Sequence, residues 1–191
     1  VQKSRSCRNR ILNNTLIGGS LAIVVRHGAG YNLIENNRIE PGDRPTAVGL
    51  YLDKTAAANM FTGNVVRGSR IGAFVSYASD AVFANNAFSD LPTEGPPGNL
   101  GAIYLFRCER MNLLNNQIDR STNGGITLLF SSDNVLAGNH VSDSKHGIGL
   151  WYDSDRNTIQ NNILAGNATN IILEKTAGNS ITANDFARSA F

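Results

Sequence analysis

Apolar and polar positions alternate in short runs along this chain, and the runs return in a fixed order. A six-residue segment that closes with Asn is followed, two residues later, by another apolar position and then by a longer alternating run. Alternation over four or five residues predicts a strand with one buried face, and helical spacing is not sustained anywhere. The pattern therefore predicts short strands separated by turns.

The same unit recurs eight times. Every copy has an apolar residue in the third place and Asn in the sixth, and the closing Asn residues are 22 or 23 residues apart except for two intervals of 27 and 30. A unit of this length cannot bury its own apolar face, but stacked units close a continuous core. The copies begin at Asn9, Asn32, Asn59, Ala81, Met111, Asn134, Asn157 and Asn179.

This repeat predicts an all-β chain, folded as a single-stranded right-handed parallel β-helix of about eight coils. Leucine-rich repeats have a similar length, but they need a Leu-x-x-Leu-x-Leu frame that is lacking here. We expect one domain over residues 1–191, because two full domains would be cramped in that length. Val1 is not an initiator Met and no apolar leader follows it, so a mature product, a trimmed chain and a fragment of a longer chain all stay open.

Stacking fixes what the closing asparagines and the two cysteines do. Equivalent residues of neighbouring coils lie about 4.8 Å apart, so the Asn amides can hydrogen-bond along the stack, and Asn also tolerates the left-handed backbone of a tight turn. Cys7 and Cys108 are four coils apart, roughly 19 Å, and a disulfide needs Cα atoms within about 7 Å. We predict two free thiols and a structural Asn ladder through Asn14, Asn37, Asn64, Asn86, Asn116, Asn139, Asn162 and Asn184.

The alternating run of each coil should bury two apolar residues and turn the residues between them outward. In the second coil this assignment buries Val48 and Leu50. The first predicted outward column contains Val24, Gly49, Phe74, Tyr104, Thr127, Gly149 and Ile172. The second contains Arg26, Tyr51, Ser76, Phe106, Leu129, Trp151 and Glu174.

The Asn-x-Ile-x-x-Asn frame, followed by Gly125-Ile-Thr-Leu or Gly147-Ile-Gly-Leu, resembles the parallel β-helix repeats of carbohydrate-active proteins. That superfamily includes pectate lyases, alginate epimerases and lyases, phage tailspikes and the NosD-like periplasmic accessory proteins. The resemblance runs from about Cys7 to Phe186 and is specific for the fold, because repeat residues build the coil and not the site. It implies a polysaccharide or oligosaccharide partner and an extracellular, periplasmic or virion location.

Candidate substrate-binding residues lie on the outward face and in two insertions, residues 40–46 and 90–99, that precede the alternating run. Sugar rings stack on aromatic faces, which makes Tyr51, Tyr104 and Trp151 candidate platforms. Trp151 also joins Phe106 and Leu129 in an apolar patch without charges, which more often marks a subunit interface or a covering loop than a sugar platform. The charged candidates beside this face are Lys175, Asp43 and Glu94.

Candidate catalytic residues follow from the two chemistries that polysaccharides undergo. Glycosidic cleavage needs a pair of carboxyl groups, for which Asp53 and Asp153 are candidates. Lyases and epimerases instead need a base beside a cation that neutralises the sugar carboxylate, and His146 and Arg107 are the candidates for these roles. A surface His at the entry of a strand is the alternative interpretation of His146.

Charge and hydropathy argue against two other kinds of partner, nucleic acid and the membrane. A net charge of +2 and no dense basic groove argue against nucleic acid, and no apolar run approaches the roughly 20 residues of a membrane span. We predict no cofactor apart from calcium, for which Asp153 and Asp155 are the candidate ligands, although turn-capping Asp residues give the same pattern.

Three classes of function stay open: a polysaccharide lyase, epimerase or glycosidase; a non-catalytic carbohydrate-binding or phage-tail module; and a NosD-like accessory protein. The stretch TEGPPGN followed by GAIYL also resembles the inulin fructotransferases. That resemblance implies a homotrimer with sites between the subunits.

Overall fold

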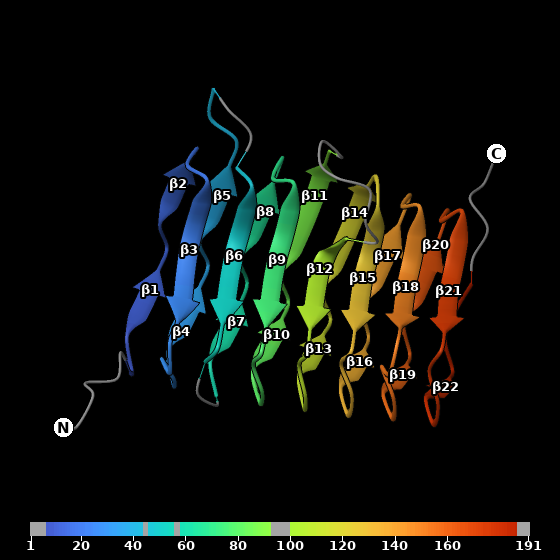
Figure 1. Cartoon of the computed structure of the whole chain (residues 1–191). Helices are drawn as coiled ribbons and strands as arrows, with labels where there is room; N and C mark the ends of the chain where they lie inside the picture. The colour runs from blue at the N-terminus through green and yellow to red at the C-terminus, as the bar shows by residue number, and fades with distance from the viewer. Residues whose placement is uncertain (1–6, 44–45, 56–57, 93–99, 187–191) are drawn as a thin grey trace.

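The chain is built from stacked β-coils. The computed structural model describes residues 7–43, 46–55, 58–92 and 100–186. All regular elements within these ranges are strands, and no helix is assigned there. The strands follow one another from the N-terminal to the C-terminal end of the stack (Figure 1). The described residues include no helix with the length and apolar character that a membrane span requires.

The strands form three parallel sheets, and each coil contributes one strand to each sheet. The first sheet contains β1 (Arg10–Leu12), β4 (Leu33–Glu35), β7 (Met60–Thr62), β10 (Val82–Ala84), β13 (Asn112–Leu114), β16 (Val135–Ala137), β19 (Thr158–Gln160) and β22 (Ser180–Thr182). The second contains β2 (Thr15–Ile17), β5 (Arg38–Glu40), β8 (Val65–Arg67), β11 (Ala87–Leu91), β14 (Gln117–Ser121), β17 (His140–Ser142) and β20 (Ile163–Ala165). The third contains β3 (Leu21–Arg26), β6 (Val48–Asp53), β9 (Ile71–Ser76), β12 (Gly101–Phe106), β15 (Gly124–Leu129), β18 (His146–Trp151) and β21 (Thr169–Glu174).

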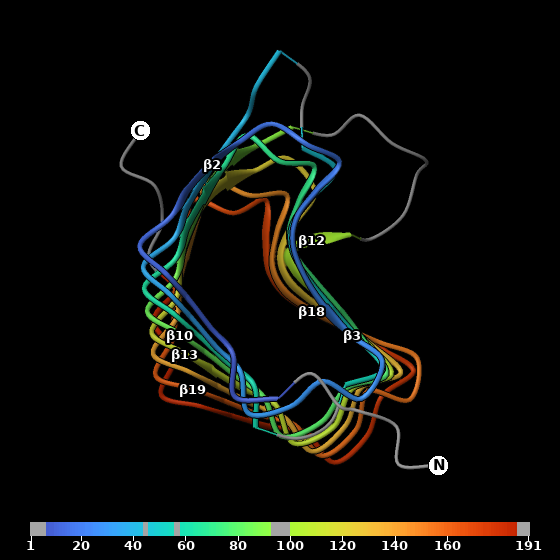
Figure 2. The same ribbon diagram turned by 90° about the vertical axis from the view of Figure 1, so that its left-hand side faces the viewer.

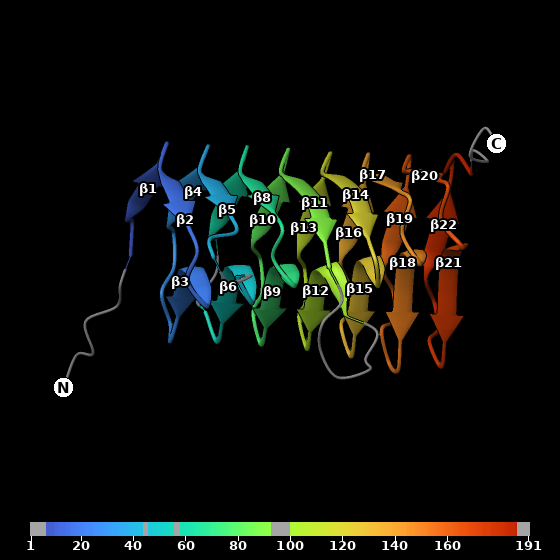
Figure 3. The ribbon, with the colours of Figure 1, turned by 90° about the horizontal axis from the view of Figure 1, so that it is seen from above.

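The described residues thus make seven coils and the first strand of an eighth. Successive coils follow nearly the same outline when the stack is viewed along its length (Figure 2), and from above they lie side by side (Figure 3). The predicted all-β parallel solenoid is confirmed.

One hydrophobic core runs the length of the stack between the three sheets. In the first sheet the inward residue of each strand repeats in register, and Phe61 stacks on Phe83 with ring centroids 4.5 Å apart. Burial of such a column supplies the apolar stabilisation that no single coil could provide. Its fully buried members in the first sheet are Ile34, Phe61, Phe83, Leu113, Leu136 and Ile159.

The predicted Asn ladder is present, and Asn139 shows how it works. Its Oδ1 accepts hydrogen bonds from the backbone N–H and Nδ2 of Asn116, at 2.9 and 3.0 Å. Its Nδ2 donates to Asn162 Oδ1 and to the Leu113 carbonyl, at 3.0 and 2.9 Å. A fully buried amide therefore has four partners, which offsets the cost of removing it from water.

The left-handed backbone belongs to the residue before each ladder Asn and not to the ladder Asn itself. Asn115, for example, has φ of 52°, whereas Asn116 is not among the residues with positive φ. The expectation that the ladder Asn also adopts the left-handed backbone of the turn was wrong, because the residue before it takes that conformation in every coil. The positive-φ positions are Asn13, Asn36, Gly63, Asn85, Asn115, Gly138, Asn161 and Ala183.

A second, interrupted Asn ladder was not predicted. Asn134 Nδ2 donates to Asn157 Oδ1, and Asn157 Nδ2 donates to Asn179 Oδ1. Asn9, Asn32 and Asn59 repeat the arrangement at the N-terminal end. The two coils between these groups have buried Ala81 and Met111 at the same position, so the core replaces the amides there.

The register of the second coil differs from the prediction by two residues. Ile23 and Val25 pair with Leu50 and Leu52, so Leu50 and Leu52 are their equivalents in the core. Val48 is also buried, but it pairs with Leu21. Val48, Leu50 and Leu52 alternate, so the sequence offered two registers, and the pairing with β3 and β9 selects one.

The bounds of the two insertions differ from the prediction, whereas the prediction of free cysteines is confirmed. The insertions are shorter than expected: Glu40 ends β5, and Asp90 and Leu91 belong to β11, while residues 93–99 lie outside the described ranges. Both cysteines are free, as predicted, and Cys108 is buried.

Candidate functional site

The corrected register brings three aromatic residues together on the outward face of the third sheet. Tyr51 pairs with Phe74 and Phe74 with Tyr104. Their rings stack at centroid distances of 5.5 and 5.4 Å, with interplanar angles of 6° and 18°. Phe74 therefore covers one face of Tyr51 and one face of Tyr104, and Tyr104, at 9% exposed, has little free ring on which a sugar could stack.

A second row of side chains follows the ends of the third-sheet strands. We call it the edge row: His27, Lys54, Tyr77, Arg107, Phe130, Tyr152 and Lys175. Each member has positive φ, between 39° and 57°. The backbone N–H groups of Tyr77 and Arg107 donate to carbonyls of the next coil, which holds these residues in line along the stack. All seven side chains are exposed.

Arg107 lies at the centre of the edge row, among aromatic rings. Its guanidinium carbon is 5.7 Å from the Tyr77 ring centroid, 5.5 Å from Phe106 and 5.6 Å from Phe130. Cation–π attraction at such distances helps to hold the guanidinium in place, and the side chain remains exposed.

The rest of the edge row repeats this combination of cation and ring. Lys54 Nζ is 5.9 Å from the Tyr77 centroid, and Lys175 Nζ is 4.7 Å from that of Tyr152. Phe130 and Tyr152 are ring neighbours at 6.0 Å. Tyr77, Phe130 and Tyr152 are 46%, 39% and 38% exposed, so each presents ring surface to a ligand.

The other turn edges carry ion pairs instead. On one, Arg110 pairs with Asp80 at 2.7 Å and Arg156 with Asp133 at 2.7 Å. The hydrogen bond from Arg110 is the main cause that lowers the pKa of Asp80 below its usual value. On another edge, Asp90 receives both Arg67 and Arg120.

The cations of the edge row lack such carboxylate partners. Among the described residues, no carboxylate oxygen lies within ion-pairing distance of Lys54, Arg107 or Lys175. The edge row therefore combines exposed rings with three cations that form no ion pair within the described ranges, while Asp53, Asp153 and Glu174 are its neighbours in the chain.

The candidate acids do not meet. Asp53 is the last residue of β6, is 8% exposed and accepts a hydrogen bond from Ser76 Oγ at 2.7 Å. Asp153 is exposed and follows β18, four inter-strand steps away, roughly 19 Å. The two carboxyl groups of a glycosidase lie about 5–10 Å apart, so Asp53 and Asp153 do not form such a pair.

The candidate base and its cation are also separated. His146 begins β18, whereas Arg107 follows the end of β12, so they occupy opposite ends of the third-sheet strands. Asp43 is exposed after β5 and likewise lies at the end opposite the edge row, while Glu94 lies outside the described residues. Only Arg107 and Lys175 of the predicted charged residues belong to the edge row.

The calcium candidates do not gather into a ligand set. Asp155 Oδ1 accepts a hydrogen bond from the Ala177 backbone N–H at 2.7 Å, which is a turn-capping role. Within the described ranges, no three His, Cys, Asp or Glu side chains cluster in a way that could hold a metal.

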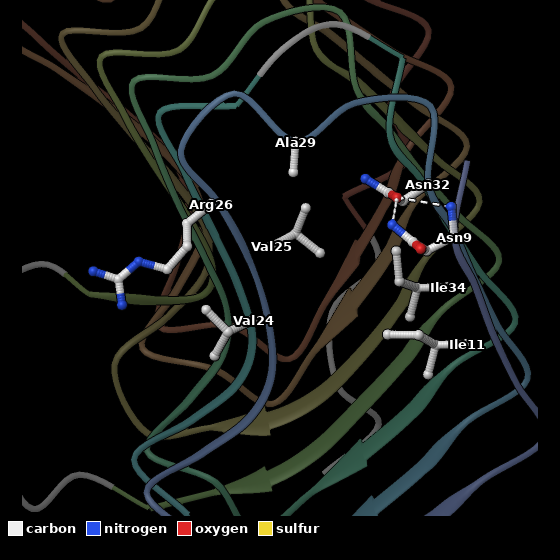
Figure 4. Close-up of a pocket in the computed structure, with 8 residues that line it drawn as sticks. All are labelled: Asn9, Ile11, Val24, Val25, Arg26, Ala29, Asn32 and Ile34. Carbon is white, nitrogen blue, oxygen red and sulfur yellow. Dashed lines mark hydrogen bonds between the residues drawn. The ribbon is translucent and has the colours of Figure 1, made fainter. Parts of the chain in front are cut away.

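A cavity of about 300 Å³ opens at the N-terminal end of the stack, where the lining residues Arg26 and Ala29 lie on either side of His27 in the chain, the first member of the edge row. Val25, Ala29, Ile34 and Ile11 line it, while the Arg26 side chain points away (Figure 4). These apolar side chains continue the core into the first coil, so the cavity is the end of the core and offers little for polar recognition.

A family model described as a right handed beta helix region matches residues 46–190. The chain belongs to this family. The match covers the coils that carry most of the edge row, and it agrees with the parallel stacking of all three sheets. No curated protein and no solved structure matches the chain. Membership in the β-helix family fixes the fold, and the functional argument rests on this chain's own surface.

Sequence reasoning missed Lys54, which follows Asp53 at the end of β6, and the three aromatic members of the edge row: Tyr77, Phe130 and Tyr152. The repeat did contain their signal, because each follows the last outward residue of a third-sheet strand. The aromatic members were passed over because an aromatic residue in a turn carries no obvious chemistry by itself. Only the positive φ at these positions shows that they line up with the cations.

Proposed function

We propose that this β-helix protein binds an acidic polysaccharide along the edge row. One observation carries the proposal: Lys54, Arg107 and Lys175 form no ion pair within the described part of the chain, and each lies over an exposed tyrosine ring. Other exposed cations, such as Arg70 and Lys145, also have no ion pair, but among the described residues only the cations of the edge row lie over aromatic rings. This combination of cation and ring suits an anionic sugar polymer.

The chemistry of the edge row fits sugars that carry carboxylates. Arg107 can bind a carboxylate through two parallel N–H donors, which is the strongest arrangement for that group. The exposed rings of Tyr77, Phe130 and Tyr152 can pack against the apolar faces of sugar rings. A neutral polysaccharide would use the rings but not the cations.

The length of the edge row favours an extended polymer. Lys54 and Lys175 are five inter-strand steps apart, roughly 24 Å. A ligand that contacts both must lie along the stack, with one contact at each coil. Because the candidate acids and the base are separated, the proposal is binding without turnover.

A binding titration tests this proposal. Polygalacturonate and alginate are compared with dextran, an uncharged polysaccharide, by calorimetry at low and at moderate salt. We expect binding of the acidic polymers only, and weaker binding as salt rises, because the contacts between charges are exposed. Equal binding of dextran, or no binding of either acidic polymer, would contradict the proposal.

The same samples test the absence of turnover. Absorbance of unsaturated uronates and release of reducing ends are followed over hours, with and without calcium. We expect both to stay at the level of the polymer alone. Steady product formation would show an enzyme and would replace a binding function with a processing one.

A further inference from the structure

Six members of the edge row occupy six successive coils. Each directly follows a strand of the third sheet, from β6 to β21, and these strands are neighbours in that sheet. Neighbouring strands lie about 4.8 Å apart, so the row presents one exposed side chain at each step of that size. In order along the stack, the six are Lys54, Tyr77, Arg107, Phe130, Tyr152 and Lys175.

Each of these side chains contacts the next one. Lys54 Nζ lies 5.9 Å from the centroid of the Tyr77 ring, and the Arg107 guanidinium lies between Tyr77 and Phe130 at 5.7 and 5.6 Å. The rings of Phe130 and Tyr152 are 6.0 Å apart, and Tyr152 in turn contacts the lysine that ends the row. The contacts are unbroken over the six coils, so the coils set the spacing of the side chains.

The side chains beside the row are withdrawn from the surface. In these six coils, the outward side chain that directly precedes each member of the row is buried or half-buried. Asp53, Ser76 and Trp151 are buried. Trp151 folds back over its own strand, because a Cβ at Gly149 would come within 2.6 Å of its Nε1, and its ring meets that of His146 at 6.4 Å. A ligand that lies along this edge therefore contacts the row itself.

The chemistry of the row changes from coil to coil in a fixed order. Cations stand at the first, third and sixth positions, tyrosine hydroxyl groups at the second and fifth, and an apolar ring at the fourth. The intervals between the cations are therefore unequal, two coils and three coils, or roughly 10 and 14 Å. A ligand that pairs with all three cations needs negative charges that can meet both intervals.

A linear polymer of 1,4-linked uronic acids meets this requirement. Each pyranose unit advances such a polymer by about the length of one ring, which is close to the spacing between coils. Every unit brings one carboxylate and its own hydroxyl groups, and rotation about the glycosidic bonds turns a carboxylate toward the cation of its coil. Carboxylates pair with the lysines and the arginine, and sugar hydroxyl groups bond to the tyrosine hydroxyl groups.

We infer that the edge row binds a linear uronate polymer in register, one sugar at each coil, over a length of six sugars. The inference rests on the proposed function and adds the length and the register of the ligand. Lys54 and Lys175 hold the two ends, and Arg107 holds the third sugar. Three sugars are enough to reach Lys54 and Arg107 together, whereas only six reach both lysines.

The first test varies the length of the ligand. Oligogalacturonates from the dimer to the octamer are titrated into the 191-residue chain by calorimetry, and malto-oligosaccharides of the same lengths serve as uncharged controls. Oligomers that bind too weakly for direct titration are measured by competition with the hexamer. We expect affinity to rise up to the hexamer and to change little from the hexamer to the octamer.

The second test compares two matched substitutions, Lys54→Gln and Lys175→Gln. Each removes one exposed positive charge that lies over one tyrosine ring. Lys54→Gln should weaken binding of both the trimer and the hexamer about fivefold, the effect of one exposed charge contact. Lys175→Gln should weaken the hexamer by the same factor and leave the trimer within about twofold of the parent, because a trimer bound to Lys54 and Arg107 does not reach the last coil.

The outcomes separate this inference from the proposed function. If the two lysine substitutions weaken the trimer alike, binding follows net charge, which would overturn the register but leave the binding of acidic polymers standing. Affinity that keeps rising from the hexamer to the octamer would overturn the length of six sugars. No binding of the hexamer or of polygalacturonate would overturn both proposals.

Discussion

Arg107 lies with its guanidinium carbon 5.6 Å from the centre of the Phe130 ring, on the next coil of the stack. The exposed cation has rings around it and no carboxylate, so Arg107→Gln should weaken polygalacturonate binding about tenfold, the effect of one charged hydrogen bond. Stability should fall by less than about 1 kcal/mol, because only exposed cation–π contacts are lost. Calorimetric titration and urea unfolding measure the two effects.

The matched control is Arg110→Gln, an equally exposed arginine that Asp80 already neutralises. Its affinity for polygalacturonate should stay within about twofold of the parent, since surface ion pairs contribute little. If both substitutions weaken binding alike, the effect comes from net charge and not from the edge row.

Asn139→Ala should destabilise the fold by about 3 kcal/mol, because it leaves the partners of four hydrogen bonds unpaired in the core. Urea unfolding followed by circular dichroism measures the loss. Asn14→Ala removes the same side chain from an exposed position at the first coil and should cost less than about 1 kcal/mol. Equal losses at the two positions would show that buried amides add nothing beyond local turn geometry.

Gly125→Ala should cost about 2–3 kcal/mol through overpacking. The new Cβ would lie 2.2 Å from Val141 Cγ1 and 2.6 Å from the Gly147 carbonyl oxygen. In the double variant Gly125→Ala/Val141→Ala, the clash with the Val141 side chain disappears and the clash with the Gly147 carbonyl remains. Gly125→Ala should therefore destabilise the Val141→Ala variant by less than it destabilises the parent, but it should still destabilise it. Additive losses in the double-mutant cycle would argue against this contact as the cause.

Burial raises the pKa of the Cys108 thiol to about 12. An unfolded thiol titrates near pH 8.5, so above that pH the unfolded chain releases a proton that the folded chain keeps. This contribution to stability is complete below about pH 8.5 and is lost as pH rises toward 12, by up to about 1.4 kcal/mol per pH unit.

Urea unfolding at pH 7.5 and at pH 10 measures that loss. Cys108→Ala should show a shallower decline than the parent, although its stability at pH 7.5 is lower because the substitution leaves a cavity. In the native parent, a thiol reagent at pH 8 should modify Cys7 and spare the buried Cys108. Rapid modification of both thiols, or identical pH profiles, would contradict the burial of Cys108.

The sequence was a good guide to the coil because the repeat is strict where the coil is built. Each closing Asn and each third-place apolar residue occupies the same place in every turn. The spacing between coils was then enough to predict that Cys7 and Cys108 are too far apart for a disulfide, and both are free. It was a poor guide to register where Val48, Leu50 and Leu52 alternate beside an insertion, because either pair could face the core.

The candidate site was predicted only in part. Arg107 and Lys175 were found because charges beside an outward column suggested chemistry, and Trp151 because it is aromatic. Asp53, Asp153 and His146 were grouped by type, and the structure places them on separate coils or at opposite ends of strands. Periodicity gives the place of a residue along the coil, but it gives neither the direction of its side chain nor its partners.

The amino-acid sequence by itself determined that the chain coils, about how many coils it makes and where one Asn ladder lies, because a period of about 23 residues with buried and turn positions admits one kind of packing. Only the tertiary structure decided that Tyr77, Arg107 and Phe130 form one row, and that Trp151 folds back onto Gly149 toward His146. Those relationships depend on positive φ at the turns and on a missing Cβ, which take effect only once neighbouring coils are in contact.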